Sequence, residues 1–315
     1  MNRAGHLIGA LVAVAGTLLA GAARGAGEAP DAGPEPPPFA RLGKPGDVID
    51  QVAVRLKSPK KSADRIDGGL HHVVFSLWLP DRGKPVRGLL LMPFNVNGVE
   101  QEHSRAMCRH WGFGLVGGNF MRVDRKEFGP RLLDGLRALA ERSGHPEVAH
   151  APLIATSMSA GVGMCVGLAE QLPDRFLCCG LACLEVGPET PQTREVPMLS
   201  VFGERDGRQM AQHEELLPRR RAAFDAEWAI APQWGRKHEW GQANNLLWPF
   251  FDEVIRQRLP ADAEPRAGPV RLRPCAPALT WYGDEILICE GDLIGKTQGE
   301  LRSLHFRRDR DWLQS

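Results

Sequence analysis

Three residues that could together perform acyl transfer occur in this 315-residue chain in the order serine, acid, histidine. They are Ser159 in SMSAG, Asp206 in VFGERD and His238 in RKHEWG, and each follows an apolar run of strand length. In a parallel sheet, functional side chains gather at the carboxyl ends of the strands. A histidine there takes the serine proton, while a carboxylate fixes the tautomer of the imidazole. A single histidine is usually structural, but three such residues in this order predict a nucleophile, a base and an orienting acid.

Two serines, Ser157 and Ser159, compete for the role of nucleophile. A nucleophile on a sharp turn from strand to helix needs small residues two positions before and two positions after it. Ser159 has Ser157 and Gly161 at those positions, whereas Ser157 has Ala155 and Ser159, so residue size permits both. The helix expected at 160–172 favours Ser159, because a turn at Ser157 would leave Ser159 inside the first helical turn. The alternative is that both hydroxyls cap an ordinary helix.

The acid also has competitors. Asp206 is favoured because a strand ending at Phe202 and a turn at Gly203 would present its carboxylate beside the end of the sheet. Glu204 lies in the same turn, and Glu185 follows the preceding predicted strand. The sequence leaves these two as alternatives.

Strand-like and helix-like segments alternate from His71 onward, which predicts the α/β class with a mainly parallel sheet and helices on both faces. The first two strands are separated by the turn-rich PDRGKPVR and are expected to form an antiparallel edge. The segment 183–196 is too short for a large cap domain. The expected strands are 73–79, 88–92, 113–117, 153–156, 176–182, 198–202 and 228–231, and the expected helices are 101–110, 132–140, 160–172, 208–226 and 247–255.

Composition divides the chain into four parts. Residues 1–26 have a positive start, an apolar middle and a small-residue end, which predicts an export signal and a secreted or periplasmic protein. An uncleaved N-terminal anchor is the alternative. Residues 27–45 form a Pro-rich linker, 46–260 hold the strands and helices, and 261–315 form a second linker with a small C-terminal appendage.

The appendage carries few aliphatic residues, so we expect residues 261–315 to attach loosely and to be dispensable for chemistry. Cys275 and Cys289 bracket APALTWYGDEILI, whose strand-like halves flank the turn YGDE. A disulfide between them would close a hairpin in an oxidising compartment. Alternatively, the segment is the fragment of a longer C-terminal region.

Charge and cysteine spacing exclude several classes of function. Lys and Arg total 39 against 38 Asp and Glu, which leaves no basic excess for binding nucleic acid. None of the 7 cysteines forms a C-x-x-C pair, so the cysteines in apolar segments are interpreted as small core residues. We predict neither a metal nor another cofactor, because no third convergent ligand joins the two polar clusters, His71-His72 and Glu100/Glu102/His103.

The motifs SMSAG, VFGERD and KHEWG resemble those of the α/β-hydrolase superfamily over about residues 70–260. The chain is most similar to exported bacterial esterases of the polyhydroxybutyrate-depolymerase and feruloyl-esterase type. It departs from them at Ser157, which replaces the first glycine of the nucleophile turn. It departs again at Lys237, which stands where a glycine would precede the histidine.

The resemblance implies an oxyanion hole and a substrate cleft. The residue after the nucleophile, Ala160, would supply one amide of the oxyanion hole, and Asn95 in LMPFNVNG the other. Phe94, Trp234 and Trp240 are expected to contact substrate, although both tryptophans could equally belong to the core.

The resulting hypothesis is an exported serine hydrolase that cleaves a carboxylic ester through an acyl-enzyme. Its substrate would be an ester, polymeric or aromatic, since a site without a cap is open. No nucleic-acid partner and no stable membrane span after signal removal are expected. The alternatives are a serine peptidase of the same fold and a non-catalytic binding protein of that fold.

Overall fold

The computed structural model describes residues 39, 41–57, 71–121, 123–184, 190–207, 228–275, 282–283 and 306–307. The predicted export signal, the helix expected at 208–226, Glu185 and Cys289 lie outside these residues. The chain divides after Glu35 into two units, and every element described below belongs to the unit Pro36–Ser315.

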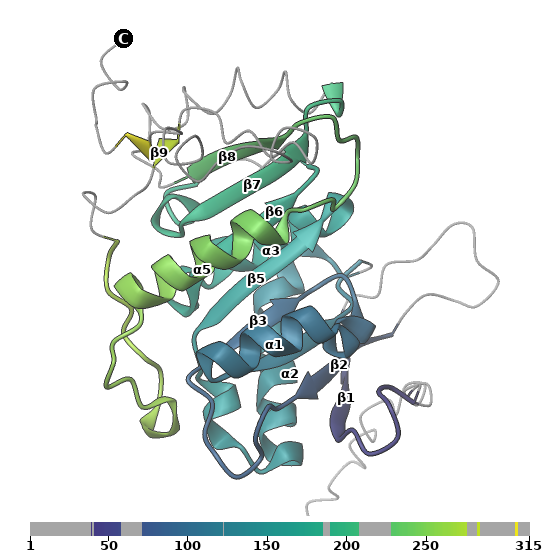
Figure 1. Ribbon diagram of the computed structural model, residues 1–315. Helices are drawn as coiled ribbons and strands as arrows, with labels where there is room; N and C mark the ends of the chain where they lie inside the picture. Colours follow the sequence, from purple (N-terminus) through teal and green to yellow (C-terminus); the bar gives the residue numbers. More distant parts are fainter. Residues whose placement is uncertain are drawn as a thin grey trace, which may run out of the picture. The chain divides into compact units, whose positions relative to one another are not determined.

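In the described part of the chain, eight strands form one sheet in the order β1-β2-β4-β3-β5-β6-β7-β8 (Figure 1). β1 and β2 run antiparallel to their neighbours, and the other neighbouring strands pair in parallel. The strands are β1 Ile49–Arg55, β2 His72–Trp78, β3 Gly88–Met92, β4 Phe113–Gly118, β5 Leu153–Met158, β6 Phe176–Ala182, β7 Met198–Gly203 and β8 Trp228–Gln233. The predicted mainly parallel sheet is confirmed.

Described helices cover both faces of this sheet, as predicted. α1, Glu102–Trp111, and α5, Asn244–Arg258, pack on one face, while α2, Phe128–Ser143, and α3, Val162–Gln171, pack on the other. Figure 1 shows α1 and α5 in front of the sheet and α2 and α3 behind it. No described helix combines the length and the apolar character needed to cross a bilayer.

The central strands bury side chains on both faces of the sheet. In β3, Leu89 and Leu91 join the apolar cluster beneath α2 and α3, whereas Leu90 and Met92 join the cluster beneath α1 and α5. Successive side chains of a strand point to opposite faces, so a strand covered on both sides has a continuous apolar sequence. GLLLM of β3 has this pattern.

The predicted antiparallel edge is wrong in one respect. Residues 88–92 do not pair with 73–79, because β3 lies between β4 and β5 and runs parallel to both. All five residues of β3 are buried, which suits a central position better than an edge that leaves backbone groups unpaired. The edge strand is β1, which the periodicity does not predict. Its partly buried sequence IDQVAVR suits a strand with one open edge.

Residues 261–275 are docked on the domain, so the expectation of loose attachment is wrong for this part of the tail. The Arg273 N–H donates to the carbonyl oxygen of Arg258 at 2.9 Å, and the Arg258 Nε donates to the carbonyl oxygen of Arg273 at 3.0 Å. Composition does not reveal such bonds, because backbone groups make all of the first bond and half of the second. Three apolar side chains of the segment also pack against the cluster beneath α1 and α5: Ala263, Val270 and Leu272.

The predicted hairpin also differs from the structure. Tyr282 and Gly283, expected to begin a turn, pair antiparallel with Phe306 and Arg307. A turn signal specifies local backbone geometry but not which distant strand completes a pair. The disulfide between Cys275 and Cys289 stays a prediction.

We expect truncation after Cys275 to preserve the fold and truncation after Pro260 to destabilise it, because only the shorter chain loses the docked segment. If truncation after Pro260 lowers the free energy of unfolding by about 3 kcal/mol, the melting temperature should fall by roughly 6–12 °C. Thermal unfolding of the two truncated proteins beside the full chain measures the difference. Identical melting curves for both truncations would show that residues 261–275 add no stability.

A buried carboxylate links the docked segment to the domain. Glu147 is 0 % exposed, its Oε1 lies 2.8 Å from His145 Nδ1 and accepts from the Val86 N–H, and its Oε2 accepts from Arg266 Nε at 3.1 Å. Burial alone would raise the pKa of the Glu147 carboxyl, but these hydrogen bonds lower the pKa below its ordinary value of 4.5. The ionised form is therefore the one that the fold stabilises.

This pKa direction predicts acid sensitivity. Since the folded-state pKa is below the unfolded one, the stabilisation is complete above about pH 4.5 and is lost as the pH falls through the folded value. Glu147→Gln should lower the free energy of unfolding by roughly 3 kcal/mol at neutral pH. It should also reduce the loss of that free energy as the pH falls. Urea unfolding at a series of pH values tests this, with Glu141→Gln as an exposed control. An unchanged acid slope in Glu147→Gln would contradict the assignment.

Candidate active site

Ser159 lies on a strained turn between β5 and α3. Its φ angle is 51°, in the left-handed region that residues other than glycine rarely adopt. Among the described non-glycine residues, only Cys183 shares this conformation. Such strain persists where the surrounding structure enforces it, and a nucleophilic serine between strand and helix is held in this manner.

The turn brings the backbone of α3 against the end of β5. A Cβ atom added at Gly161 would lie 1.9 Å from Ser157 Oγ and 2.8 Å from Ser157 Cβ. It would also lie 3.0 Å from Phe94 Cβ, on the loop after β3. Gly161 is therefore required for close approach, and Ser157 is the small residue that it contacts.

We expect Gly161→Ala to destabilise the protein by about 1–3 kcal/mol and to reduce activity, because the added methyl group overpacks the turn. Ser157→Gly in the same chain should restore part of the loss, since it removes both of the closest atoms. Gly163→Ala is the matched control: Gly163 lies two residues further along, in α3, and its added Cβ would meet no atom within 4 Å. Denaturant unfolding of the two single variants and the double variant measures the coupling free energy between positions 157 and 161. Equal stability of the two alanine variants would contradict the contact.

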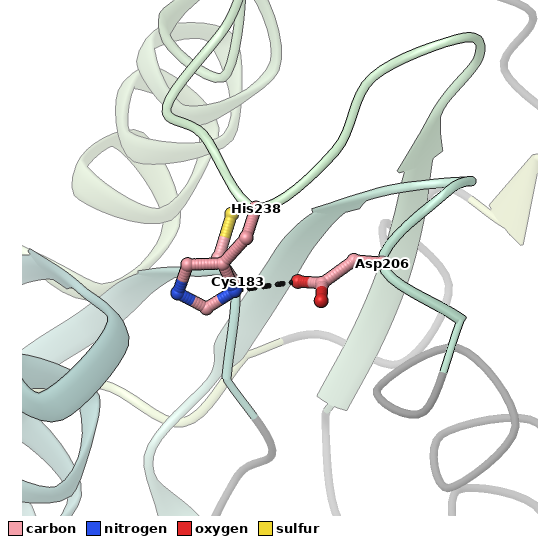
Figure 2. A group of neighbouring side chains, drawn as sticks. All are labelled: Cys183, Asp206 and His238. Carbon is pink, nitrogen blue, oxygen red and sulfur yellow. Dashed lines mark hydrogen bonds and ion pairs between the residues drawn. The ribbon is translucent and has the colours of Figure 1, made fainter.

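His238 joins Ser159 to Asp206. His238 Nε2 lies 2.9 Å from Ser159 Oγ, and His238 Nδ1 lies 2.8 Å from Asp206 Oδ2 (Figure 2 shows the latter contact). The side chain of Asp206 is 14 % exposed and that of His238 is 42 % exposed. The structure thus brings together the three residues predicted from their order, with the side chain of Asp206 more shielded from solvent than that of His238.

A second glycine sets the geometry of the histidine loop. A Cβ at Gly203, the last residue of β7, would lie 2.3 Å from the carbonyl oxygens of both Arg236 and Lys237. The loop after β8 therefore crosses directly over the end of β7, with the Arg205 N–H donating to Arg236 O at 2.8 Å. This crossing places His238 beside Asp206.

The two acidic side chains of the turn after β7, Glu204 and Asp206, have different partners in the structure. Glu204 Oε2 accepts from the Gly235 N–H at 2.9 Å and so supports the loop backbone two residues after β8 ends. Asp206, two residues further along, is the carboxylate that contacts His238.

Asn95 lies in a different environment from the one expected of an oxyanion-hole donor. Its N–H donates to the Met92 carbonyl at 3.3 Å, and its side-chain oxygen accepts from the Asn97 N–H at 2.9 Å. The preceding amide, of Phe94, has no acceptor in the described part of the chain and lies next to the Ser159 turn. The Ala160 N–H, in the first turn after Ser159, likewise lacks an intrahelical acceptor.

Two exposed apolar side chains lie on the loops that follow β3 and β4. Phe94, on the loop after β3, is 37 % exposed, and Met121, on the loop after β4, is 50 % exposed. The two loops are joined where the Phe120 N–H donates to the Pro93 carbonyl at 3.0 Å. Met121 was not predicted. Its one signal in the sequence is an apolar residue placed just after a strand end, where a polar loop residue is more usual.

The two predicted substrate-binding tryptophans are placed differently. Trp240 packs partly buried against the cluster beneath α1 and α5, and its Nε1 donates to Asn244 Oδ1 at 3.1 Å, so it supports the core. Trp234 is half-buried in the turn after β8, and its indole N–H is buried without an acceptor in the described residues. Of the three residues expected to contact substrate, only Phe94 is fixed beside the serine turn.

The position of each site residue in the sheet decides the fold. The serine turn follows β5, the acid follows β7 and the histidine follows β8, in an eight-stranded sheet whose first two strands are antiparallel. The chain has the α/β-hydrolase fold. The fold implied by the sequence motifs is confirmed.

Solved structures similar to this chain include the feruloyl esterase module from Clostridium thermocellum, with 14% identity and a TM-score of 0.44 over 68% of this chain and 90% of that chain. A dienelactone hydrolase from Anabaena variabilis gives 14% identity and a TM-score of 0.41 over 66% of this chain and 97% of that chain. A protein assigned as a dipeptidyl aminopeptidase IV from Bacteroides ovatus gives 12% identity and a TM-score of 0.43. The match covers 67% of this chain but spans only 35% of that chain. No family profile and no curated protein sequence matches the chain.

The cysteines of the α/β-hydrolase domain fall into two groups. Cys108, Cys165, Cys178 and Cys179 are 0 % exposed in the core. The sequence predicts this core position for Cys165, Cys178, Cys179 and Cys183. Cys183, at the end of β6, is also buried, but its sulfur lies within 4.8 Å of the ligand atoms of Asp206 and His238. Within the described residues this is the one group of three potential metal ligands, and neither His71-His72 nor His103 belongs to it.

Proposed function

We propose that the protein is a serine hydrolase that cleaves carboxylic esters through an acyl-enzyme, with Ser159 as nucleophile, His238 as base and Asp206 as orienting acid. One observation carries the proposal: an unbroken chain of contacts of 2.8 and 2.9 Å from Asp206 through His238 to Ser159. The strained φ of Ser159 supports catalysis over simple binding, because a residue that only caps a helix needs no such conformation.

The contacts of His238 support a proton path from Ser159 to the imidazole. With Asp206 accepting from Nδ1–H, the free lone pair of His238 is on Nε2 and can accept the Ser159 proton. Ser159 Oγ then attacks the ester carbonyl, and the imidazolium returns its proton to the departing alcohol. Water, deprotonated by the same nitrogen, hydrolyses the acyl-enzyme and regenerates Ser159.

The oxyanion of the tetrahedral intermediate would be stabilised by two backbone amides. Ala160 N–H is one donor, and we assign the other to Phe94 N–H in place of Asn95, because the Asn95 amide already donates to Met92. Loss of one such donor typically costs about 3–4 kcal/mol of transition-state stabilisation. The exposed ring of Phe94 and the exposed side chain of Met121 would contact the acyl group of the substrate.

We further propose export to the periplasm or the medium. The support is the N-terminal pattern of residues 1–26, a positive start, an apolar run and a small-residue end. N-terminal sequencing of the protein from the producing cell tests this proposal. A start within residues 20–30 is expected, and an intact Met1 on a cytoplasmic protein would refute it.

Hydrolysis of p-nitrophenyl esters of increasing chain length, beside feruloyl esters and p-nitroanilides, tests the function. We expect ester turnover that is absent from Ser159→Ala, with anilides cleaved far more slowly. Turnover of anilides at ester rates would favour the peptidase alternative. If no ester is cleaved and no serine is reactive, the binding-protein alternative stands.

A further inference from the structure

Cys183 lies at this site, but its thiol takes no part in the proposed reaction. It directly follows β6, and its N–H donates to Val201 O of β7 at 2.9 Å, so its backbone is fixed to the sheet. Its φ angle of 57° is strained, like that of Ser159. Strain of this kind gathers at functional sites, which indicates a role for this position beyond filling the core.

The thiol points at the histidine loop. Cys183 Sγ donates to the carbonyl oxygen of Glu239, the residue after His238, at 3.0 Å. Figure 2 shows the Asp206 carboxylate meeting the His238 imidazole, with the Cys183 side chain beside them. The sulfur lies within 4.8 Å of the ligand atoms of both residues. The three residues follow β6, β7 and β8, which are adjacent in the sheet, so the three side chains are held on a common rigid edge.

The three ligand atoms form a donor set suited to zinc. A thiolate, an imidazole nitrogen and a carboxylate oxygen are the ligands that Zn²⁺ prefers, with a fourth position left to water. Magnesium and calcium prefer oxygen ligands throughout. The described chain offers this combination of ligand types in no other cluster.

The spacing is close to what zinc requires. Ligand bonds of about 2.0–2.3 Å in a tetrahedron place ligand atoms roughly 3.3–3.7 Å apart. Here all three atoms lie within 4.8 Å of one another, and the Asp206 and His238 atoms are already 2.8 Å apart. A metal would need this pair to open by about half an ångström and the sulfur to approach by up to about one ångström.

We propose that Cys183, Asp206 and His238 form a zinc site that switches the enzyme off. The site and the catalytic triad are alternative uses of the same two side chains, since a metal on His238 Nδ1 displaces the hydrogen bond to Asp206. This inference rests on the proposed function for its inhibitory consequence, but metal binding itself does not.

The binding step is balanced by the release of one proton. Zn²⁺ takes the Cys183 thiolate, and the thiol proton leaves to solvent. The His238 proton transfers from Nδ1 to Nε2, so that Nδ1 binds the metal as neutral imidazole. With its proton on Nε2, His238 can no longer accept the proton of Ser159.

Binding is measured first without reference to catalysis. Co²⁺ replaces Zn²⁺ as a spectroscopic probe, and Ser159→Ala is the protein, because Ser159 is not a ligand. We expect a thiolate-to-cobalt charge-transfer band that titrates to one metal per chain and disappears on addition of Zn²⁺. The band should be lost in a second chain that also carries Cys183→Ala. Cys183→Ser, which keeps a hydroxyl donor to Glu239, should lose the band as well.

Inhibition is measured next in chains that retain Ser159. Zn²⁺ should inhibit ester hydrolysis, and Cys183→Ala should weaken the inhibition by more than about tenfold, since even outer-shell partners of a metal are worth 10–100-fold in affinity. Each variant is compared with its own rate in chelator. A chain with Cys275→Ser and Cys289→Ser is the matched control for thiols elsewhere and should keep both the band and the inhibition.

The outcomes separate the two proposals. No band in Ser159→Ala, a band that survives Cys183→Ala, or equal zinc inhibition with and without Cys183 would overturn the zinc site and leave the hydrolase intact. A band that depends on Cys183 in a protein that hydrolyses no ester would support the metal site while refuting the proposed function.

Discussion

Replacing Ser159 by alanine should abolish ester hydrolysis, with kcat reduced by about six orders of magnitude, while Ser157→Ala should retain most of the activity. Removal of a nucleophilic serine from a complete triad has effects of this size, because the remaining groups act only as a unit. Ser157 instead fills the space facing Gly161, where alanine is also small enough. Steady-state kinetics on a p-nitrophenyl ester measure both variants.

Folding of both variants is checked by circular dichroism and thermal unfolding, so that a lost activity can be assigned to chemistry. If Ser157→Ala were the inactive variant and Ser159→Ala the active one, the nucleophile would lie two residues earlier than the structure places it. The contact of 2.9 Å between Ser159 Oγ and His238 Nε2 makes the opposite result the expected one.

Asp206→Asn should lower kcat by about four orders of magnitude without unfolding the protein. The asparagine amide would donate to His238 Nδ1 and so keep the imidazole proton on Nε2, where it cannot accept the proton of Ser159. Glu204→Gln is the matched control, since Glu204 lies in the same turn and its carboxylate accepts from the loop backbone at Gly235. Near-normal turnover in Asp206→Asn would transfer the role to Glu204 or to Glu185.

Much of the fold could be predicted from the sequence, because long periodic segments define elements even when their pairing is unknown. The strand 176–182 is observed with the predicted bounds as β6. The position of β3 could not be predicted, since GLLLM specifies burial on two faces but not which neighbours supply it. The docking of residues 261–275 was hidden for a similar reason: the reciprocal bonds of Arg258 and Arg273 use backbone groups that every residue has.

The candidate site likewise has a part that the sequence could predict and a part that it could not. Side-chain chemistry and chain order led to the prediction of Ser159, Asp206 and His238, and the structure places these three side chains in contact. Backbone roles were harder to assign. Whether Asn95 or Phe94 presents a free amide depends on a turn bond to Met92.

Cys183 illustrates the limit of sequence patterns. An apolar strand with a cysteine at its end is typical of a core residue, and four other cysteines of the domain are core residues. Only the adjacency of β6, β7 and β8 brings its sulfur to the imidazole and the carboxylate.

The central claim is that one serine, Ser159, is activated for nucleophilic attack. Labelling of the purified protein with a fluorophosphonate, followed by peptide mapping by mass spectrometry, tests this claim most directly. We predict one adduct per chain, on Ser159, with no adduct in Ser159→Ala and strongly slowed labelling in Asp206→Asn. Absence of any adduct on the folded protein, or an adduct on Ser157 in its place, would contradict the account.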